Sequence, residues 1–163
     1  MLNSATLKTP IGDLNLIVEE NILLAAGFKS LDNLIGRLAP ADANQEIRQI
    51  AKIPIISELI SEYFDGNLSA INPIKVRQPG AKFSQEAWKA MRRIPAGKTI
   101  SYAELAKRAG SADAIRAAGT ACGNNLIAPI IPCHRIIKSG GGLGNYGYGI
   151  QVKEWLLTHE GAI

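Results

Sequence analysis

A cysteine, a histidine and an arginine stand side by side at Cys133-His134-Arg135, where an apolar run that starts after Asn125 ends. The thiolate is the nucleophilic form of cysteine, and a nearby imidazole or guanidinium lowers the pKa of the thiol. This triplet therefore predicts a nucleophilic cysteine. Successive side chains of an extended segment point to opposite sides. Contact between Cys133 and His134 thus needs a turn of the backbone or a bridging water.

Glu160 is the candidate third member of this group, because a carboxylate can orient His134 and balance its charge; the spacing of the two residues does not show that they meet. The other cysteine, Cys122, fits an inert, buried residue. The chain has two Cys and two His, none of them before residue 122, so we expect no structural zinc site and no cofactor. Two cysteines also fit a reducing, intracellular compartment better than a disulfide framework.

A glycine-rich loop at residues 139–149 follows the triplet. It lacks the Gly-Lys-Ser/Thr ending of a P-loop and the strand-loop-helix context of a dinucleotide site. Its tyrosines, Tyr146 and Tyr148, favour the wall of a pocket that stacks on a flat group. A flexible surface connection is the alternative.

The elements that must position these residues fall into two parts. Alternation of Leu14, Leu16 and Val18 with their neighbours predicts short antiparallel strands in residues 1–30. Helical spacing of apolar residues predicts a helix between Pro54 and Gly66. Residues 67–80 show no period, and we place a domain boundary there. The domains are then 1–79 and 80–163, in an α+β fold.

The second part is predicted to be mainly helical. Ser84 is the expected cap of its first helix, and Ser101, with Glu104 three residues on, forms a capping box for a helix to about Ala109. Ser111 is the expected cap of a third helix, and a last helix ends near Gly161. Two helices joined by a turn around 110–111 match a helix-turn-helix, although most such pairs are ordinary packed helices.

Charge distinguishes the two parts. Residues 81–163 carry 11 Lys or Arg and 5 Asp or Glu, whereas residues 1–80 carry 7 and 9. A positive second half favours a polyanion partner such as nucleic acid, with chance surface charge as the alternative. No apolar stretch is long enough for a membrane span, and the N-terminus has no signal-peptide pattern.

The second part resembles the O6-alkylguanine-DNA alkyltransferases, also called methylated-DNA–protein-cysteine methyltransferases. The resemblance is carried by Pro132-Cys133-His134-Arg135 with Asn125 eight residues before the cysteine, and by further blocks in the same order. These blocks are 95–102, 115–119, 144–146 and 153–161. The first part resembles the family more loosely, through 9–12 and 62–66.

The resemblance implies a suicide repair protein that binds duplex DNA through the minor groove and flips out the damaged base. It would move the alkyl group from O6-alkylguanine, and from O4-alkylthymine, onto Cys133, once per molecule. It also implies a ribonuclease-H-like first domain and a winged-helix-like second domain. We expect a monomer, in the cytoplasm or, in a eukaryote, the nucleus, with no membrane partner.

Residue roles follow from the same resemblance. His134, acting through a water and backed by Glu160, would generate the thiolate, Tyr102 would donate a hydrogen bond to the departing base, and Asn125 would be a hinge. Arg116 would fill the vacated base stack. The remaining residues implied to contact DNA are Thr99, Ser101, Ala117, Ala121, Arg135 and Ser139. The base would be read by backbone groups of Cys133 and Ile136, by Tyr146 and by the Gly147 amide.

Some features leave the reaction open. Tyr148 stands where some family members have a small residue, which predicts a narrower pocket and slow reaction with benzyl-sized adducts. A lesion-binding relative without group transfer would lack Cys133. A helix-turn-helix regulator would not need it, and a Cys-His hydrolase would turn over an ester.

Overall fold

The computed structural model describes residues 1–163 and divides into two compact units. Unit 1 consists of Met1–Pro79 and Leu126–Ile130, and unit 2 of Gly80–Asn125 and Ile131–Ile163. The fold is a mixed α+β fold, as the sequence predicts. The short segment 126–130 belongs to unit 1 although the sequence-based division at residue 79 assigns it to the second part.

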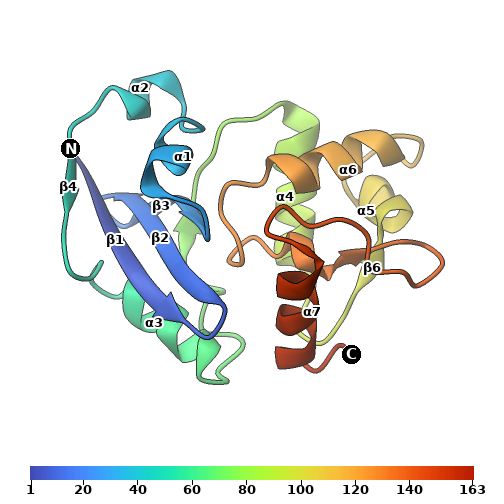
Figure 1. Cartoon of the computed structure of the whole chain (residues 1–163). Helices are drawn as coiled ribbons and strands as arrows, with labels where there is room; N and C mark the ends of the chain where they lie inside the picture. Colours follow the sequence, from blue (N-terminus) through green and yellow to red (C-terminus); the bar gives the residue numbers. More distant parts are fainter. The chain divides into compact units, whose positions relative to one another are not determined.

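Unit 1 is built on a five-stranded sheet. Strands β1 (Leu2–Thr9), β2 (Gly12–Glu19) and β3 (Ile22–Gly27) form the predicted antiparallel meander and lie side by side in Figure 1. Two short parallel strands complete the order β4-β1-β2-β3-β5, namely β4 (Ile47–Gln49) and β5 (Lys75–Val76). Leu14, Leu16 and Ile17 of β2 are fully buried, so both faces of this central strand lie in the core.

Three helices accompany this sheet: α1 (Leu31–Ile35), α2 (Pro40–Ala43) and α3 (Ile56–Phe64). Helix α3 is the one predicted between Pro54 and Gly66. It buries Ile56, Ile60 and Tyr63, which lie on one face at the spacing of an amphipathic helix.

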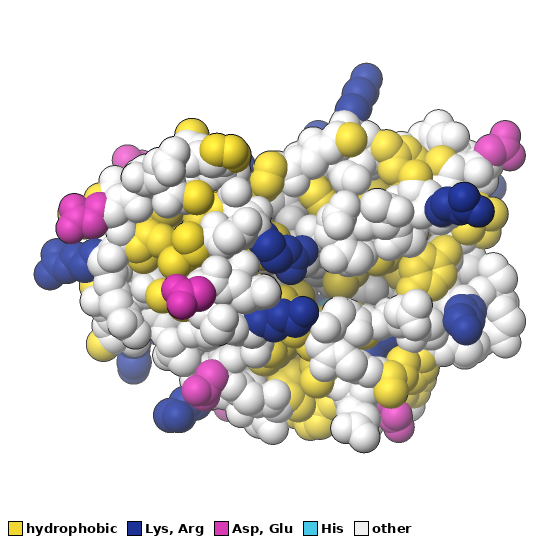
Figure 2. All heavy atoms as spheres, turned by 45° about the horizontal axis from the view of Figure 1, so that its top comes forward, with side chains coloured by type: hydrophobic (Ala, Val, Ile, Leu, Met, Phe, Trp, Pro, Cys, Tyr) yellow, Lys and Arg dark blue, Asp and Glu magenta, His cyan; other side chains and the backbone are white.

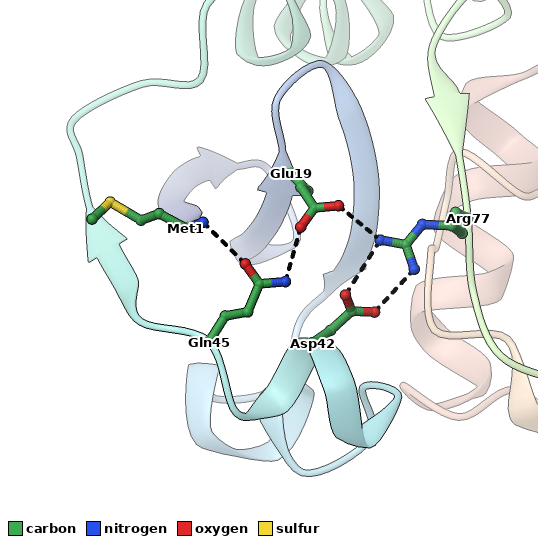
Figure 3. A network of polar contacts seen from close by, with 5 residues as sticks. All are labelled: Met1, Glu19, Asp42, Gln45 and Arg77. Carbon is green, nitrogen blue, oxygen red and sulfur yellow. Dashed lines mark hydrogen bonds and ion pairs between the residues drawn. The ribbon is translucent and has the colours of Figure 1, made fainter.

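A chain of polar contacts joins the edges of unit 1 (Figure 3). Arg77, directly after β5, pairs with Asp42 at 3.0 Å and with Glu19 at 3.3 Å. Glu19 also accepts a 2.8 Å hydrogen bond from Gln45, which in turn accepts one from the amino group of Met1. The network therefore fixes the strand that leads out of unit 1.

The segment 126–130 continues the edge of β3 beyond the place where β5 ends. The Ala26 N–H donates to the Leu126 carbonyl at 2.9 Å, and the Ala128 N–H donates to the Ala26 carbonyl at 3.0 Å, in a parallel bridge. The Leu126 N–H donates to the side chain of Gln78 at 2.8 Å. Residues 126–130, late in the chain, are thus held by β3 and by Gln78 near the end of the first segment of unit 1.

Unit 2 contains four helices: α4 (Lys82–Arg92), α5 (Tyr102–Arg108), α6 (Ile115–Asn124) and α7 (Ile150–His159). The short strands β6 (Ile100–Ser101) and β7 (Ile136–Ile137) pair in parallel. Helices α4, α5 and α6 contact one another. The Trp88 indole donates to the Ala121 carbonyl at 2.9 Å, which fixes α4 against α6.

Helix caps confirm one prediction and correct two. The Ser101 side chain accepts from the Glu104 N–H and caps α5, as predicted. Helix α4 begins before Ser84, with Ala81 at its N-cap, and α6 begins only at Ile115, with Ala114 at its N-cap. Ser111 does not cap α6, because a turn at residues 112–113 separates it from the helix; its N–H donates to the Ala106 carbonyl and closes the preceding helix. None of the helices combines the length and apolar character that crossing a bilayer requires.

Candidate active site

The cysteine lies in a single turn of 3-10 helix, Cys133–Arg135, rather than in an extended strand. The Cys133 N–H donates to the Ile131 carbonyl at 2.9 Å, and the Arg135 N–H donates to the Pro132 carbonyl at 3.0 Å. In this turn, consecutive side chains do not alternate between two opposite sides as they would in an extended strand. Cys133 is 7% exposed.

His134, Arg135 and Glu160 form a buried cluster. The Glu160 carboxylate lies 2.8 Å from His134 Nε2, and it accepts two hydrogen bonds from the Arg135 guanidinium, at 2.8 and 2.9 Å. Arg135 also donates to the Ile94 carbonyl at 2.6 Å. Glu160 comes to this cluster as the C-cap of α7. Residues 134 and 160, whose spacing left contact open, therefore meet directly.

The charges of this cluster follow from its contacts. Burial acts to raise the pKa of Glu160, but the hydrogen bonds and charges of His134 and Arg135 outweigh it and hold that pKa well below its usual range. Burial lowers the pKa of His134, so the imidazole is neutral near pH 7. The Glu160 carboxylate can only accept, so we assign the His134 proton to Nε2. His134 Nδ1 is then an acceptor, and it is buried with no hydrogen-bond partner in the protein.

Asn125 connects the end of α6 to the cysteine. Its side-chain amide donates to the Ile131 carbonyl at 2.8 Å and to Cys133 Sγ at 3.3 Å. Burial raises the pKa of the Cys133 thiol, while the Asn125 hydrogen bond and the charge of Lys153 act to lower it. The resting group is therefore a thiol whose ionised form already has a hydrogen-bond donor.

A cavity of about 400 Å³ opens at this cysteine. Cys133, Tyr102 and Tyr146 line it together with several residues of α6. The other lining residues are Arg116, Gly119, Thr120, Cys122, Gly123, Asn145 and Gly147. Burial raises the pKa of Tyr102 to about 12, so its phenol stays protonated and can donate a hydrogen bond at neutral pH.

Lys153 is a site residue that the sequence reasoning missed. It is fully buried, and its ammonium donates to the carbonyls of Ile136 at 2.6 Å and of Asn145 at 3.3 Å. The same ammonium lies 5.9 Å from the centre of the Tyr102 ring. Burial lowers the pKa of Lys153. Its position in the sequence could have identified it, because Lys153 lies one helical turn before Leu157 and two turns before Glu160, on the buried face of α7.

Two residues predicted to contact DNA lie inside the protein. Arg135 is 3% exposed, and its guanidinium donates hydrogen bonds to the Glu160 carboxylate and the Ile94 carbonyl. Ala121 is fully buried, and its carbonyl accepts a hydrogen bond from the Trp88 indole. We therefore correct both: Arg135 is part of the buried cluster, and Ala121 packs α6 against α4.

The other residues predicted to contact DNA lie at or near the surface. Arg116, Ala117 and Ser139 are exposed, and Thr99 and Ser101 are half-buried. Ile136, which is predicted to read the base, is fully buried, and its carbonyl accepts a hydrogen bond from Lys153.

The tyrosine positions differ in detail from the expectation. Tyr148 does not line the cavity; its ring packs edge-on against that of Tyr146, with centroids 5.6 Å apart. Cys122, interpreted as inert and buried, is half-exposed and faces the same cavity as Cys133. Burial raises the pKa of its thiol.

The described residues offer no group of three His, Cys, Asp or Glu side chains placed to hold a metal ion.

Of the basic residues of the second half, Arg135 and Lys153 are buried and the others are at least partly exposed. Figure 2 shows Lys and Arg side chains spaced over the face that it draws, interspersed with acidic ones.

The sequence of the chain is similar to a known protein family and to individual curated proteins. Residues 82–162 match the family model described as the DNA-binding domain of 6-O-methylguanine DNA methyltransferase. A methylated-DNA–protein-cysteine methyltransferase of Methanosarcina acetivorans is 35% identical over 158 residues, which are 97% of each chain. One of Shigella flexneri is 44% identical over 106 residues, which span 65% of this chain but only 62% of that protein.

Solved structures give the same likeness. The crystal structure of Mycobacterium tuberculosis O6-methylguanine methyltransferase superposes with a TM-score of 0.81 at 33% sequence identity, covering 99% of this chain and 94% of that one. A second structure from that organism, described as a complex with DNA, superposes with a TM-score of 0.81 at 32% identity and covers 98% of this chain.

Proposed function

Because the chain belongs to the 6-O-methylguanine DNA methyltransferase family, we propose that it repairs duplex DNA by moving an alkyl group from a base to Cys133. The substrates are O6-alkylguanine and O4-alkylthymine, and the transfer is irreversible, so each molecule acts once. One observation carries the proposal. The nucleophile lies at a cavity of about 400 Å³ and is followed directly by a neutral histidine whose Nδ1 has no partner in the protein.

The thiolate is generated by His134. Nδ1 accepts the Cys133 proton through a water, and the resulting imidazolium is stabilised by the Glu160 carboxylate at 2.8 Å. Arg135 keeps that carboxylate ionised and oriented, which is the part it plays in place of DNA contact.

Transfer is a displacement at the alkyl carbon. Cys133 Sγ forms a bond to that carbon, the bond from the carbon to O6 breaks, and its electron pair goes to the base. Tyr102, whose phenol stays protonated, donates a hydrogen bond to the departing base. The proton count closes because the thiol releases one proton and the base takes up one. The product is a thioether, which has no leaving group that would regenerate the thiol.

DNA is bound by α5 and α6, which act as a helix-turn-helix in a winged-helix-like unit, with α6 against the minor groove. Exposure of Arg116 and Ala117 on α6 supports this arrangement. The damaged nucleotide is flipped into the cavity, at a cost of a few kcal/mol. Arg116, which lies both at the surface and at the cavity, fills the vacated stack. Thr99, Ser101 and Ser139 contact the backbone of the DNA.

The flipped base is read by the backbone of Cys133, the Tyr146 side chain and the Gly147 amide, which line the cavity, and by the backbone of Ile136. Tyr148 limits the size of the alkyl group through its edge-on contact with Tyr146. Unit 1 has a ribonuclease-H-like fold and a structural role in this proposal. We propose that the protein works as a monomer in the cytoplasm.

Mass spectrometry of the intact protein and its peptides tests this function. The protein is mixed with a slight excess of duplex DNA that carries one O6-methylguanine, with Cys133→Ser as the matched control. One methyl group on the Cys133 peptide, absent from the variant and limited to one per molecule, supports the proposal. Tight binding of the damaged duplex without added mass would instead indicate a lesion-binding protein. If the protein shows no methyl transfer and no preference for the damaged duplex, both the repair function and the lesion-binding function are refuted.

A further inference from the structure

The buried side chain of Gln78 holds the peptide group that follows Asn125. Its Oε1 accepts a hydrogen bond from the Leu126 N–H at 2.8 Å. Gln78 is 7% exposed and Leu126 is 2% exposed. Water is therefore a poor substitute for this acceptor, and a buried N–H without a partner is costly.

This hydrogen bond acts on Asn125 because the peptide unit is planar. The N–H of Leu126 lies in the same plane as the Cα and carbonyl of Asn125. An acceptor that fixes the direction of this N–H also fixes the ψ angle of Asn125, which is 118°. The hydrogen bonds to Ala26 act on the Leu126 carbonyl and the Ala128 N–H, which are one and two peptide groups further along. Gln78 thus holds the peptide group directly after Asn125, and the Asn125 N–H itself donates to the Cys122 carbonyl at 3.3 Å.

The orientation of Asn125 matters at the nucleophile. Both hydrogen bonds of its side-chain amide, to the Ile131 carbonyl and to Cys133 Sγ, come from the one nitrogen Nδ2. The two N–H groups of an amide are fixed in a plane. A rotation about ψ of Asn125 therefore misaligns the donor to the sulfur.

We propose that Gln78 is a positioning residue for Cys133: it fixes the peptide after Asn125 and so aims the Asn125 amide at the sulfur. The proposal rests on the proposed function for its biological purpose, but its physical content is the reactivity of one thiol. Gln78 stabilises the thiolate form of Cys133 without contacting it.

Three variants test the proposal. Gln78→Met keeps the length of the side chain and removes the acceptor, whereas Gln78→Glu keeps an acceptor oxygen. Arg77→Met is the matched control, because it breaks the ion pairs to Asp42 and Glu19 next door and leaves the Leu126 N–H untouched. The readout is the rate at which iodoacetamide alkylates Cys133 as a function of pH, measured by peptide mass spectrometry.

Gln78→Met is expected to slow alkylation below the pKa of the thiol by about threefold to tenfold and to move the pH profile upward, because a weakened hydrogen bond to the thiolate disfavours ionisation. Gln78→Glu restores most of the rate. Arg77→Met lowers the thermal stability of the protein without moving the profile. With O6-methylguanine duplex, Gln78→Met lowers the rate of transfer at saturating DNA and leaves the half-saturating DNA concentration within about twofold.

Hydrogen exchange on the unaltered protein provides a second test that does not depend on the folding of any variant. The Leu126 amide is expected to exchange slowly, with the protection of the β3 amides. Rapid exchange at Leu126, or an unchanged pH profile in folded Gln78→Met, overturns the proposal. A shifted profile in a protein that transfers no methyl group from DNA refutes the proposed function and leaves the role of Gln78 intact.

Discussion

Replacing Glu160 by glutamine removes one charge from the buried cluster and keeps its shape. The carboxylate accepts three hydrogen bonds, one from His134 and two from Arg135. A glutamine has one acceptor oxygen, and its amide group would face a donor. The Arg135 guanidinium, 3% exposed, would then be buried without a counter-charge. Breaking a buried pair in this way costs about 3–5 kcal/mol.

Urea unfolding followed by tryptophan fluorescence measures this cost where it arises. Trp88 and Trp155 are the two tryptophans of the chain, and both belong to unit 2. With a slope of about 2 kcal/mol per molar urea, Glu160→Gln should lower the midpoint by about 1.5–2.5 M. The variant should also transfer no methyl group at a measurable rate, because the imidazolium of His134 loses its stabilising charge.

The pH dependence gives an internal check. The pKa of Glu160 is depressed in the folded protein from its ordinary 4.5. Its contribution to stability is therefore complete above pH 4.5 and is lost as the pH falls below that value. The gap between wild type and Glu160→Gln should narrow there by about 1.4 kcal/mol per pH unit. A difference below about 1 kcal/mol at pH 7, or a gap that does not change in acid, would refute the assigned role of the cluster.

Three further changes test other parts of the structure. In Gly80→Ala the new methyl carbon would lie 2.5 Å from the buried Trp88 ring, so we expect a loss of about 1–3 kcal/mol in thermal unfolding; unaltered stability would contradict this packing. Gly119→Ala meets no atom within 4 Å and should stabilise α6 by about 1 kcal/mol. Its methyl group enters the cavity, so transfer from benzylguanine should slow more than transfer from methylguanine. Since burial raises the pKa of Cys133 above 9.0, its alkylation by iodoacetamide should still accelerate above pH 9, and Asn125→Ala should shift that rise to higher pH; an identical profile would exclude the hydrogen bond to sulfur.

Features that depend on neighbouring residues were predictable from the sequence. The alternation in β2 and the cap at Ser101 are local patterns, and both predictions are confirmed. The predicted cap at Ser111 is wrong because a turn at residues 112–113 separates Ser111 from α6, which begins at Ile115. A serine after a helix marks a boundary, but the sequence does not show whether the next helix begins there or a few residues later.

Features that depend on distant partners were not predictable. The resemblance implies that Arg135 contacts DNA, and an arginine is usually exposed, yet a carboxylate 25 residues away draws it into the interior. The position of Lys153 on the buried face of α7 could have indicated its burial, but the sequence does not show that the carbonyls of Ile136 and Asn145 accept from its ammonium. Burial of charge is decided by tertiary partners, which a single sequence does not reveal.

The placement of segment 126–130 in unit 1 has a consequence for synthesis on the ribosome. Domains generally fold in order as they emerge, the N-terminal one first. Here the first 79 residues emerge without segment 126–130, which pairs with β3 at Ala26. The Leu126 N–H that donates to Gln78 is added only after 47 further residues. A nascent chain or a fragment that stops at Pro79 therefore carries an unpaired strand edge, the kind of surface that promotes association with other chains. Unit 1 is completed only shortly before Cys133 is added to the chain.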